Sequence, residues 1–306
     1  VPPDILTNDN LSEMVDTSDE WIRTRTGICN RHIAKDMDNA DMAYNAARNA
    51  VEDARIEASK IGLIIVATST PDYAFPNQAS LVQAKLKAVN AMCFDVSAAC
   101  SGFITALDIA ASMLKAGSYK YALVIGSEKM SEIVNWKDRS VCVLFGDGAG
   151  AVVLKAVDNN TEDVTGALVG HGTGASVLTG GRRFSDSCST DIFIHMDGQE
   201  VFKFAVKSVP TAIETLLHNN NMDINEVDKF ILHQANVRII ESVAKRLKAD
   251  KDKFPVNLNE YGNTSSASIP ILLDELNRNG SLKQGEKLVL AGFGAGLSWG
   301  SILLVW

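Results

Sequence analysis

The stretch VLFGDGAGAVVL at residues 143–154 is matched near the end of the chain by VLAGFGAGLSWGSILL at residues 289–304. In each stretch, apolar residues typical of a strand precede a glycine-rich segment, and a second apolar strand follows it. Two similar halves could bury their sheets against each other, so the pattern predicts an internal duplication. Neither glycine-rich segment leads into a helix, which argues against a dinucleotide-binding fingerprint.

Helical and strand patterns alternate through most of the chain, which predicts an α/β fold. A segment from about residue 159 to 191, rich in Gly, Ser and Thr, is interpreted as loops between the halves. We therefore expect two domains, residues 1–160 and 161–306. The predicted strands cover residues 63–66, 91–96, 121–125, 141–145, 151–154, 229–232, 288–290 and 300–305, and the predicted helices cover 42–54, 77–87, 101–115, 201–219, 237–248 and 269–279.

Composition narrows the class of protein. The 306 residues carry a formal net charge of −8, so nucleic acid is not an expected partner. No apolar run is long enough to span a membrane and no signal peptide opens the chain, although Val1 is not an initiator Met and a short preceding piece remains an open alternative. Five cysteines without a CxxC pair predict a reducing, cytoplasmic protein with no disulfide framework and no metal site.

Cys100 is the best candidate nucleophile in the chain. It lies in DVSAACSGF at residues 95–103, directly after a predicted buried strand and at the start of a predicted helix. The free N–H groups and partial positive charge of a helix N-terminus favour a thiolate, and the small flanking residues leave room for a substrate. A buried structural cysteine is the alternative, and it is the interpretation that we give to the other four.

Three further segments are candidates for the same site. His233 follows the predicted strand 229–232, at the edge where open α/β sheets gather their active sites. Asn263 lies among small residues before a predicted helix, and the glycine-rich segment around Ala295 could bring backbone N–H groups to a ligand. Read separately, these are also typical of a core histidine, a helix cap and a turn.

Together the segments resemble the condensing enzymes of the thiolase superfamily, and most closely the β-ketoacyl-acyl carrier protein synthase III family. The matching motifs occur in family order over nearly the whole chain: DTSDEWI at 16–22 with RTGI at 25–28, the Cys100 segment, FGDGAG at 145–150, GQEVFK at 198–203, HQAN at 233–236, YGNTS at 261–265 and WGS at 299–301. The resemblance implies a thiolase-like five-layered αβαβα fold of two similar halves, and usually a homodimer.

The resemblance also implies roles for individual residues. Cys100, His233 and Asn263 would form the catalytic triad, with the N–H groups of Cys100 and Ala295 as an oxyanion hole. Trp21 and Arg139 match a pair that sandwiches the adenine of coenzyme A, and Arg25 matches a residue near its phosphates. Phe75 and Phe145 match acyl-pocket residues, Phe75 reaching into the pocket of the partner subunit.

The implied reaction is a decarboxylative condensation that initiates fatty acid synthesis. Cys100 would take the acyl group from acetyl-CoA or another short acyl-CoA, and malonyl-acyl carrier protein would then extend it. Coenzyme A enters as a thioester substrate, and no cofactor is expected. The segment Gly294-Ala295-Gly296 and the following Leu297-Ser298 depart from the residues common in the family, so the length and branching of the primer stay open.

The acyl carrier protein is acidic, so its docking needs a local basic surface on this acidic chain. Helical spacing places pairs of basic residues on shared faces, and a solvated charged face is the alternative. The candidates are Lys203, Lys207, Arg238, Lys245 and Arg246.

Four other kinds of protein would share some of these residues. A condensing or acyl-transfer enzyme of secondary metabolism would use the same triad on another acceptor. A degradative thiolase is rejected because its second catalytic cysteine lies near the chain end, whereas no cysteine follows Cys188 here. A cysteine hydrolase would pair Cys100 with His233 but would not need the Asn263 segment or the Trp21–Arg139 slot. A non-catalytic binding protein would not need all three triad residues.

Overall fold

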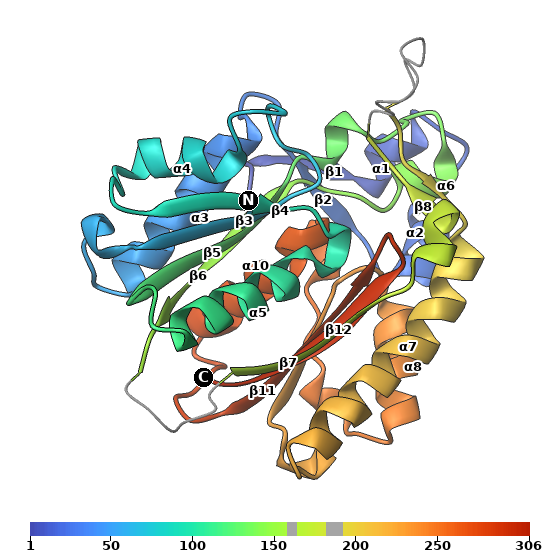
Figure 1. The fold of residues 1–306 in the computed structure, drawn as a ribbon. Coiled ribbons are helices and arrows are strands. Elements are labelled where there is room, and N and C mark those ends of the chain that lie inside the picture. Colours follow the sequence, from blue (N-terminus) through green and yellow to red (C-terminus); the bar gives the residue numbers. More distant parts are fainter. Residues whose placement is uncertain (158–163, 182–191) are drawn as a thin grey trace.

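The computed structural model describes residues 1–157, 164–181 and 192–306. Two four-stranded sheets lie between three layers of helices, which gives the five-layered αβαβα arrangement (Figure 1). The first sheet has the strand order β4-β3-β5-β6 and the second has the order β10-β11-β12-β7. The strands are β3 (Leu63–Ala67), β4 (Met92–Val96), β5 (Tyr121–Glu128), β6 (Gly148–Lys155), β7 (Val164–Gly170), β10 (Lys229–Leu232), β11 (Lys287–Gly294) and β12 (Ser298–Val305).

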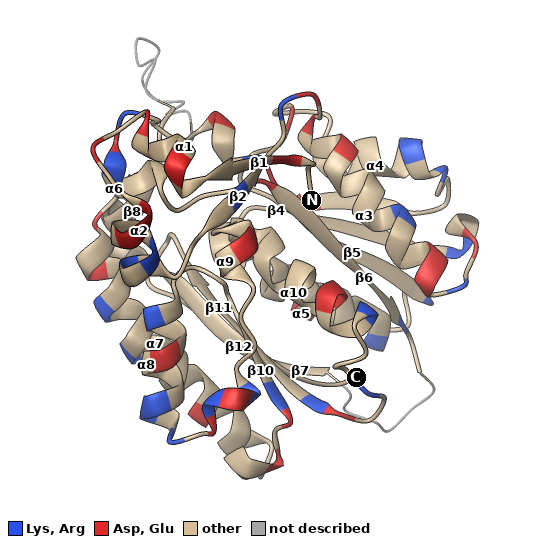
Figure 2. Cartoon of the chain, turned by 180° about the vertical axis from the view of Figure 1, so that it is seen from behind, with Lys and Arg blue, Asp and Glu red and all other residues tan. Residues whose placement is uncertain are grey.

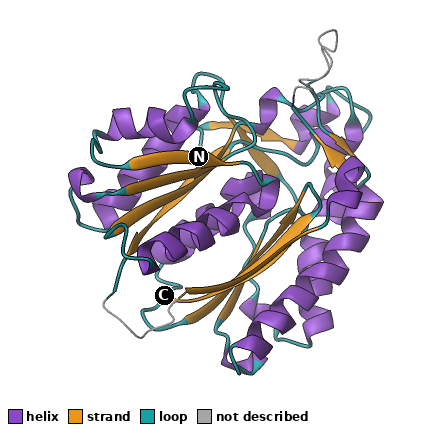
Figure 3. Cartoon of the chain, in the orientation of Figure 1, coloured by secondary structure: helices purple, strands orange, loops and turns teal. Residues whose placement is uncertain are grey.

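Three pairs of long helices form the helical layers (Figure 3). One pair covers the outside of the first sheet, a second lies between the sheets, and a third covers the outside of the second sheet. In that order they are α3 (Asn39–Asp53) with α4 (Gln78–Leu86), α5 (Gly102–Lys115) with α10 (Ser268–Arg278), and α7 (Gly198–Asn219) with α8 (Val237–Leu247).

Shorter elements surround this framework. They are β1 (Asp4–Thr7), α1 (Asn8–Ser12), α2 (Asp19–Thr26), β2 (Asn30–Ile33), α6 (Arg139–Cys142), β8 (Leu178–Thr179), β9 (His195–Met196), α9 (Leu258–Tyr261) and the 3₁₀ turns η1 (Ala58–Lys60), η2 (Ala99–Ser101), η3 (Met130–Glu132), η4 (Gly172–Val177), η5 (Ile224–Glu226), η6 (Lys251–Lys253) and η7 (Ser265–Ala267).

The core is apolar on both sides of the central helices. Strand β3 is buried along its whole length because helices cover both faces of its sheet, which is why its sequence is a continuous apolar run. Helix α5 contacts strands of both sheets, and it buries apolar residues around much of its circumference. One cluster of buried side chains thus joins the two sheets through α5 and α10, including Ile65, Phe103, Leu107, Leu272, Leu290 and Ile302.

The two sheets share a common pattern. In the first, β3 and β5 are parallel and β5 and β6 antiparallel; in the second, β10 and β11 are parallel and β11 and β12 antiparallel. The fourth strand differs, since β4 pairs with β3 whereas β7 pairs with β12. The predicted domain boundary at residues 160/161 lies outside the described residues.

Two local predictions were wrong. The predicted strand 141–145 is instead the end of α6 and the turn after it. Most of its apolar side chains are buried, but its only β pairing among the described residues is an isolated bridge between Phe145 and Asn263. Much of the predicted loop 159–191 is ordered, and residues 164–170 form β7 on the edge of the second sheet. The parts at 159–163 and 182–191 lie outside the described residues.

Among the residues that the structure describes, no helix combines the length and apolar character needed to cross a bilayer.

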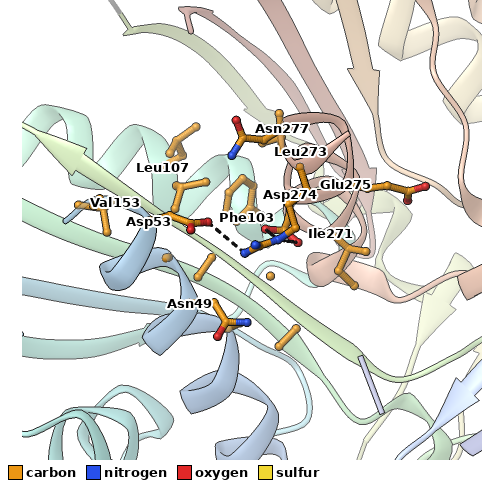
Figure 4. Close-up of a pocket in the computed structure, with 18 of the residues that line it drawn as sticks. Asn49, Asp53, Phe103, Leu107, Val153, Ile271, Leu273, Asp274, Glu275 and Asn277 are labelled. Atoms are coloured by element: carbon orange, nitrogen blue, oxygen red, sulfur yellow. Dashed lines mark hydrogen bonds and ion pairs between the residues drawn. The ribbon is translucent and has the colours of Figure 1, made fainter. Parts of the chain in front are cut away.

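A cavity of about 880 Å³ runs along one edge of β6, between α3 and α10 (Figure 4). Arg278 lies in it and forms ion pairs with Asp53 at 3.0 Å and Asp274 at 2.8 Å. None of the predicted site residues lines this cavity.

Candidate active site

A second cavity, of about 1090 Å³, brings together the predicted triad. Cys100, His233 and Asn263 all line it, although they come from widely separated parts of the chain. Ala295 and Phe145 line the same cavity. The three predicted triad residues therefore lie at one place, beside the N-terminal ends of the two central helices.

Cys100 lies in η2, immediately before α5. The preceding Ala99 has φ +46°, in the left-handed region that a residue with a side chain seldom adopts. This turn carries the chain sharply from β4 into α5 and leaves the thiol facing the cavity. The helix N-terminus favours a thiolate, but burial raises the pKa of Cys100 to about 12. The expectation from sequence of an activated thiol is therefore incomplete, because desolvation outweighs the helix when no substrate is bound.

The Ala295 segment packs directly against the nucleophile. A Cβ added to Gly294 would lie 2.8 Å from Cys100 N, so only glycine permits this approach. The Ser298 hydroxyl lies 2.8 Å from the Ser101 hydroxyl and donates to the Ala295 carbonyl at 3.0 Å. These contacts fix the backbone of Ala295 beside that of Cys100.

His233 is buried at the end of β10 and its imidazole is uncharged. The backbone N–H of His233 donates to the carbonyl of Ala291 on β11 at 2.8 Å, and Phe293 packs edge-on against the imidazole ring. Burial lowers the pKa of His233 to about 3. Nδ1 lies 2.7 Å from the Ser268 hydroxyl, which itself accepts from the Gln234 N–H. When the Ser268 hydroxyl donates to Nδ1, the single ring hydrogen of the neutral imidazole is on Nε2.

Asn263 is held with a defined amide orientation. Its backbone exchanges hydrogen bonds with the turn after α6, where Asn263 N donates to Leu144 O at 2.8 Å and Gly146 N donates to Asn263 O at 3.1 Å. The side-chain oxygen accepts the Ser265 N–H at 2.9 Å. With Oδ1 so engaged, the Nδ2 hydrogens are the groups that Asn263 can offer to a ligand.

Trp21 and Arg25 line the outer part of the cavity, on α2. The Arg25 guanidinium lies 4.6 Å from the centre of the Trp21 ring, and that of Arg139 lies 5.3 Å from it. A planar base between Trp21 and Arg139 needs about 7 Å, two contact distances of about 3.5 Å. The half-exposed Arg139 side chain must therefore move outward for a base to enter.

Phe75 is the predicted acyl-pocket residue that the structure does not bring into this cavity. Its side chain is 87% exposed, whereas Phe145 is only 4% exposed and lines the cavity wall. Within one chain Phe75 is thus not part of the cavity wall.

The five basic candidates lie exposed on α7 and α8, which pack against each other (Figure 2). The first turns of both helices line the cavity, at Phe202 beside Lys203 and at Ile239 beside Arg238. Lys203 is engaged by Glu200, at 2.8 Å between Nζ and Oε1. Figure 2 shows acidic residues among the basic ones on these helices.

Sequence reasoning missed two groups that support the site, Glu128 and Ser268. Glu128 ends the apolar strand β5, and a charged residue at the end of a buried strand is a signal that could have identified it. Ser268 carried no such signal, because a serine at a helix start is an ordinary cap.

Comparison with known proteins shows the family of the chain. Models of the 3-oxoacyl-[acyl-carrier-protein] synthase III family match residues 94–170 and, for its C-terminal part, residues 217–306. A curated β-ketoacyl-[acyl-carrier-protein] synthase III of Clostridium botulinum strain 657 is 49% identical over 312 residues, covering 100% of this chain and 96% of that protein.

Two solved structures illustrate the range of similar proteins. 3-Oxoacyl-[acyl-carrier-protein] synthase III from Aquifex aeolicus is 46% identical with a TM-score of 0.95, covering 100% of this chain and 97% of that one. The priming β-ketosynthase of the R1128 polyketide pathway is 35% identical with a TM-score of 0.94, covering 99% and 92%. The chain therefore belongs to the β-ketoacyl-[acyl-carrier-protein] synthase III family of condensing acyltransferases.

Proposed function

We propose that the protein condenses a short acyl-CoA with malonyl-acyl carrier protein through an acyl thioester on Cys100, and so initiates fatty acid synthesis. The observation that carries this is the meeting of Cys100, His233 and Asn263 in one cavity with Trp21 and Arg25 at its outer part. Cys100 attacks the acyl-CoA carbonyl and coenzyme A leaves. The neighbouring N–H groups of Cys100 and Ala295 hold the oxyanion of this step.

His233 and Asn263 serve the second substrate. The His233 Nε2 hydrogen and the Asn263 Nδ2 hydrogens donate to the thioester carbonyl of the malonyl group. Loss of carbon dioxide places negative charge on that oxygen, where fixed donors in a buried site stabilise it. The resulting carbanion attacks the acyl carbonyl on Cys100, and the thiolate leaves. An uncharged His233 suits this role. Its Nε2–H donates a hydrogen bond to the thioester oxygen, and the step does not require a proton to leave the imidazole.

Product analysis tests the proposed reaction. Incubated with acetyl-CoA and malonyl-acyl carrier protein, the protein should form acetoacetyl-acyl carrier protein, in which the acetyl group has replaced the carboxylate lost as carbon dioxide, and mass spectrometry detects this product. Free acid without a new carbon–carbon bond would support a hydrolase instead. A product only with another acceptor would support an enzyme of secondary metabolism, and a series of acyl-CoA primers defines the chain length.

The basic residues of α7 and α8 form the proposed docking surface for the acidic carrier protein. Charge reversal at Arg238 and Lys245 should lower kcat/KM for the carrier-bound substrate about tenfold, or about 1.4 kcal/mol, because attraction becomes repulsion. Acylation of Cys100 by acyl-CoA should change little. Reversal of Lys60 and Lys115, exposed and remote from α8, is the matched control. Equal loss in both half-reactions would contradict the assignment.

A homodimer in the cytoplasm is the proposed form of the protein. Phe75 and Tyr73 are 87% and 60% exposed, and they lie close to the edge strand β4, since Asn77 donates to Cys93 O. A second copy covering this margin would bury Phe75 and place it near a partner's acyl pocket. The oligomeric state in solution tests this. A reducing compartment also suits a reaction that depends on the free thiol of Cys100.

A further inference from the structure

Glu128 is a fully buried carboxylate at the end of β5. Hydroxyl and N–H groups surround it: Thr70 Oγ1 and Ser266 Oγ at 2.8 Å, Ser69 N at 3.0 Å, Ser265 Oγ at 3.1 Å and Thr68 Oγ1 at 3.3 Å. Across residues 1–157, 164–181 and 192–306, no ion pair joins a basic side chain to this carboxylate. A buried charge held only by hydrogen bonds can also be neutralised by a proton.

One of those hydroxyls also contacts the nucleophile. Cys100 Sγ donates to Ser265 Oγ at 3.4 Å, and Ser265 Oγ donates in turn to Glu128 Oε1. Ser265 has φ +50° and its N–H donates to Asn263 Oδ1, so its position is set by the backbone. Gly126 permits η7 to lie against β5, because a Cβ there would be 2.4 Å from Ser266 O. The result is an unbroken S–H···O–H···carboxylate chain.

The thiol needs a proton acceptor that the triad does not provide. Acyl transfer requires a thiolate, yet burial raises the pKa of Cys100 to about 12. Burial also lowers the pKa of His233 to about 3, which makes it a poor base at neutral pH. Burial raises the pKa of Glu128, so its protonated form is accessible.

We propose, resting on the proposed function, that Glu128 receives the Cys100 proton through Ser265 while Cys100 attacks the acyl thioester. The thiol hydrogen passes to Ser265 Oγ as the Ser265 hydrogen passes to Glu128 Oε1. The sulfur bonds to the acyl carbon, the carbon–sulfur bond to coenzyme A breaks, and the released coenzyme A thiolate takes a proton from water.

Glu128 then keeps its proton while the acyl group is on the enzyme. Protonated Glu128 is neutral, so no negative charge lies on this carboxyl group while the malonyl carbanion develops in the cavity. When the condensation expels Cys100 as a thiolate, the proton returns through Ser265. Over the full cycle Glu128 and Cys100 are unchanged, and one proton from water ends on coenzyme A. Glu128 does not touch the substrate and acts only through Ser265.

Among the described residues, few titratable groups other than Cys100 lie near Glu128 and could exchange a proton with it. From η2 it faces Cys100, from η7 the hydroxyls of Ser265 and Ser266, and from the 68–70 segment two threonine hydroxyls and a backbone N–H. On its own strand end, Lys129 follows it in sequence, but that ammonium lies 3.0 Å from Glu132. His233 lines the cavity that Cys100 also lines, and its imidazole is uncharged at neutral pH because burial lowers its pKa to about 3. The proposal requires that Glu128 and Cys100 hold one proton between them over the neutral range.

The pH dependence of Cys100 alkylation by iodoacetamide tests the proposal without any acyl substrate. A failure of the proposed reaction would therefore be distinguishable from a failure of this inference. The rate is followed on the Cys100 peptide by mass spectrometry from pH 6 to 8.5. In the unmodified chain the rate should be nearly flat, because proton transfer inside the pair does not depend on pH. In Glu128→Gln it should rise about tenfold per pH unit and be about 10²-fold lower at pH 7.

Two more variants serve as a second test and a matched control. Ser265→Ala breaks the chain but leaves Glu128 in place, and it should show the same steep profile even if Glu128→Gln does not fold. Ser266→Ala removes a shorter hydrogen bond to the same carboxylate oxygen, at 2.8 Å against 3.1 Å for Ser265, but Ser266 is not the hydroxyl that accepts from Cys100 Sγ, so the variant should keep the flat profile. If Glu128 acted only by repelling the thiolate, Glu128→Gln would react faster at every pH, and that result would overturn the proposal.

Discussion

Replacing Cys100 by alanine should abolish acyl transfer, with condensation falling about 10⁶-fold, to background. Among the residues that the structure describes, no other thiol lines the cavity, since Cys29, Cys93 and Cys142 lie outside its wall. Incubation with radioactive acyl-CoA should therefore label the unmodified chain at Cys100 and leave Cys100→Ala unlabelled.

The same variant should still decarboxylate the malonyl thioester. The donors on His233 and Asn263 are assigned to that step, and the thiol is not needed for it. Residual decarboxylation would also show that the variant is folded. Cys93→Ala is the matched control, because it removes a half-buried thiol of β4 outside the cavity and should label normally. Persistent labelling of Cys100→Ala would refute the assignment of the nucleophile.

Replacing His233 by alanine should lower the rate of malonyl decarboxylation by about 10²- to 10³-fold, the cost of losing one oxyanion donor. Acylation of Cys100 should be retained, because His233 is not the proposed acceptor of the thiol proton. Burial lowers the pKa of His233 to about 3, so this loss should be the same from pH 5.5 to 8. Carbon dioxide release and Cys100 acylation are measured separately.

Ser268→Ala provides a graded comparison with His233→Ala. It removes the partner of Nδ1 and leaves the imidazole in place, so a smaller loss of decarboxylation is expected. If His233 were instead the base for Cys100, acylation would be lost in His233→Ala while decarboxylation survived. That outcome would reverse the division of roles proposed for the two half-reactions.

The sequence predicted those parts of the fold whose patterns are local. The run 63–66 is buried on both faces and is strand β3, and the periodic segment at 101–115 is α5. The run 141–145 was misassigned because a short apolar segment does not distinguish a buried turn from a strand. Strand β7 was missed because its sequence VTGALVG is rich in small residues, and its pairing with β12 joins segments more than 120 residues apart in the sequence.

The candidate site was likewise predicted from the sequence only in part. Motifs in family order pointed to Cys100, His233 and Asn263, which do line one cavity. The state of the thiol could not be predicted, because the pKa of Cys100 depends on how completely the two sheets enclose it. The contact of Ser265 with Glu128 joins residues 137 positions apart, and no local pattern encodes it.

The enclosure of α5 between the two sheets has a consequence for dissolved ions. The field of this helix reaches Cys100 through protein, where mobile ions do not enter, so added salt hardly screens it. The basic side chains of α7 and α8 face solvent, where a Debye length of about 8 Å at physiological ionic strength weakens their attraction for a distant partner. We therefore expect added salt to weaken docking of the acidic carrier protein on α7 and α8, while the effect of the helix on the buried Cys100 thiol changes little.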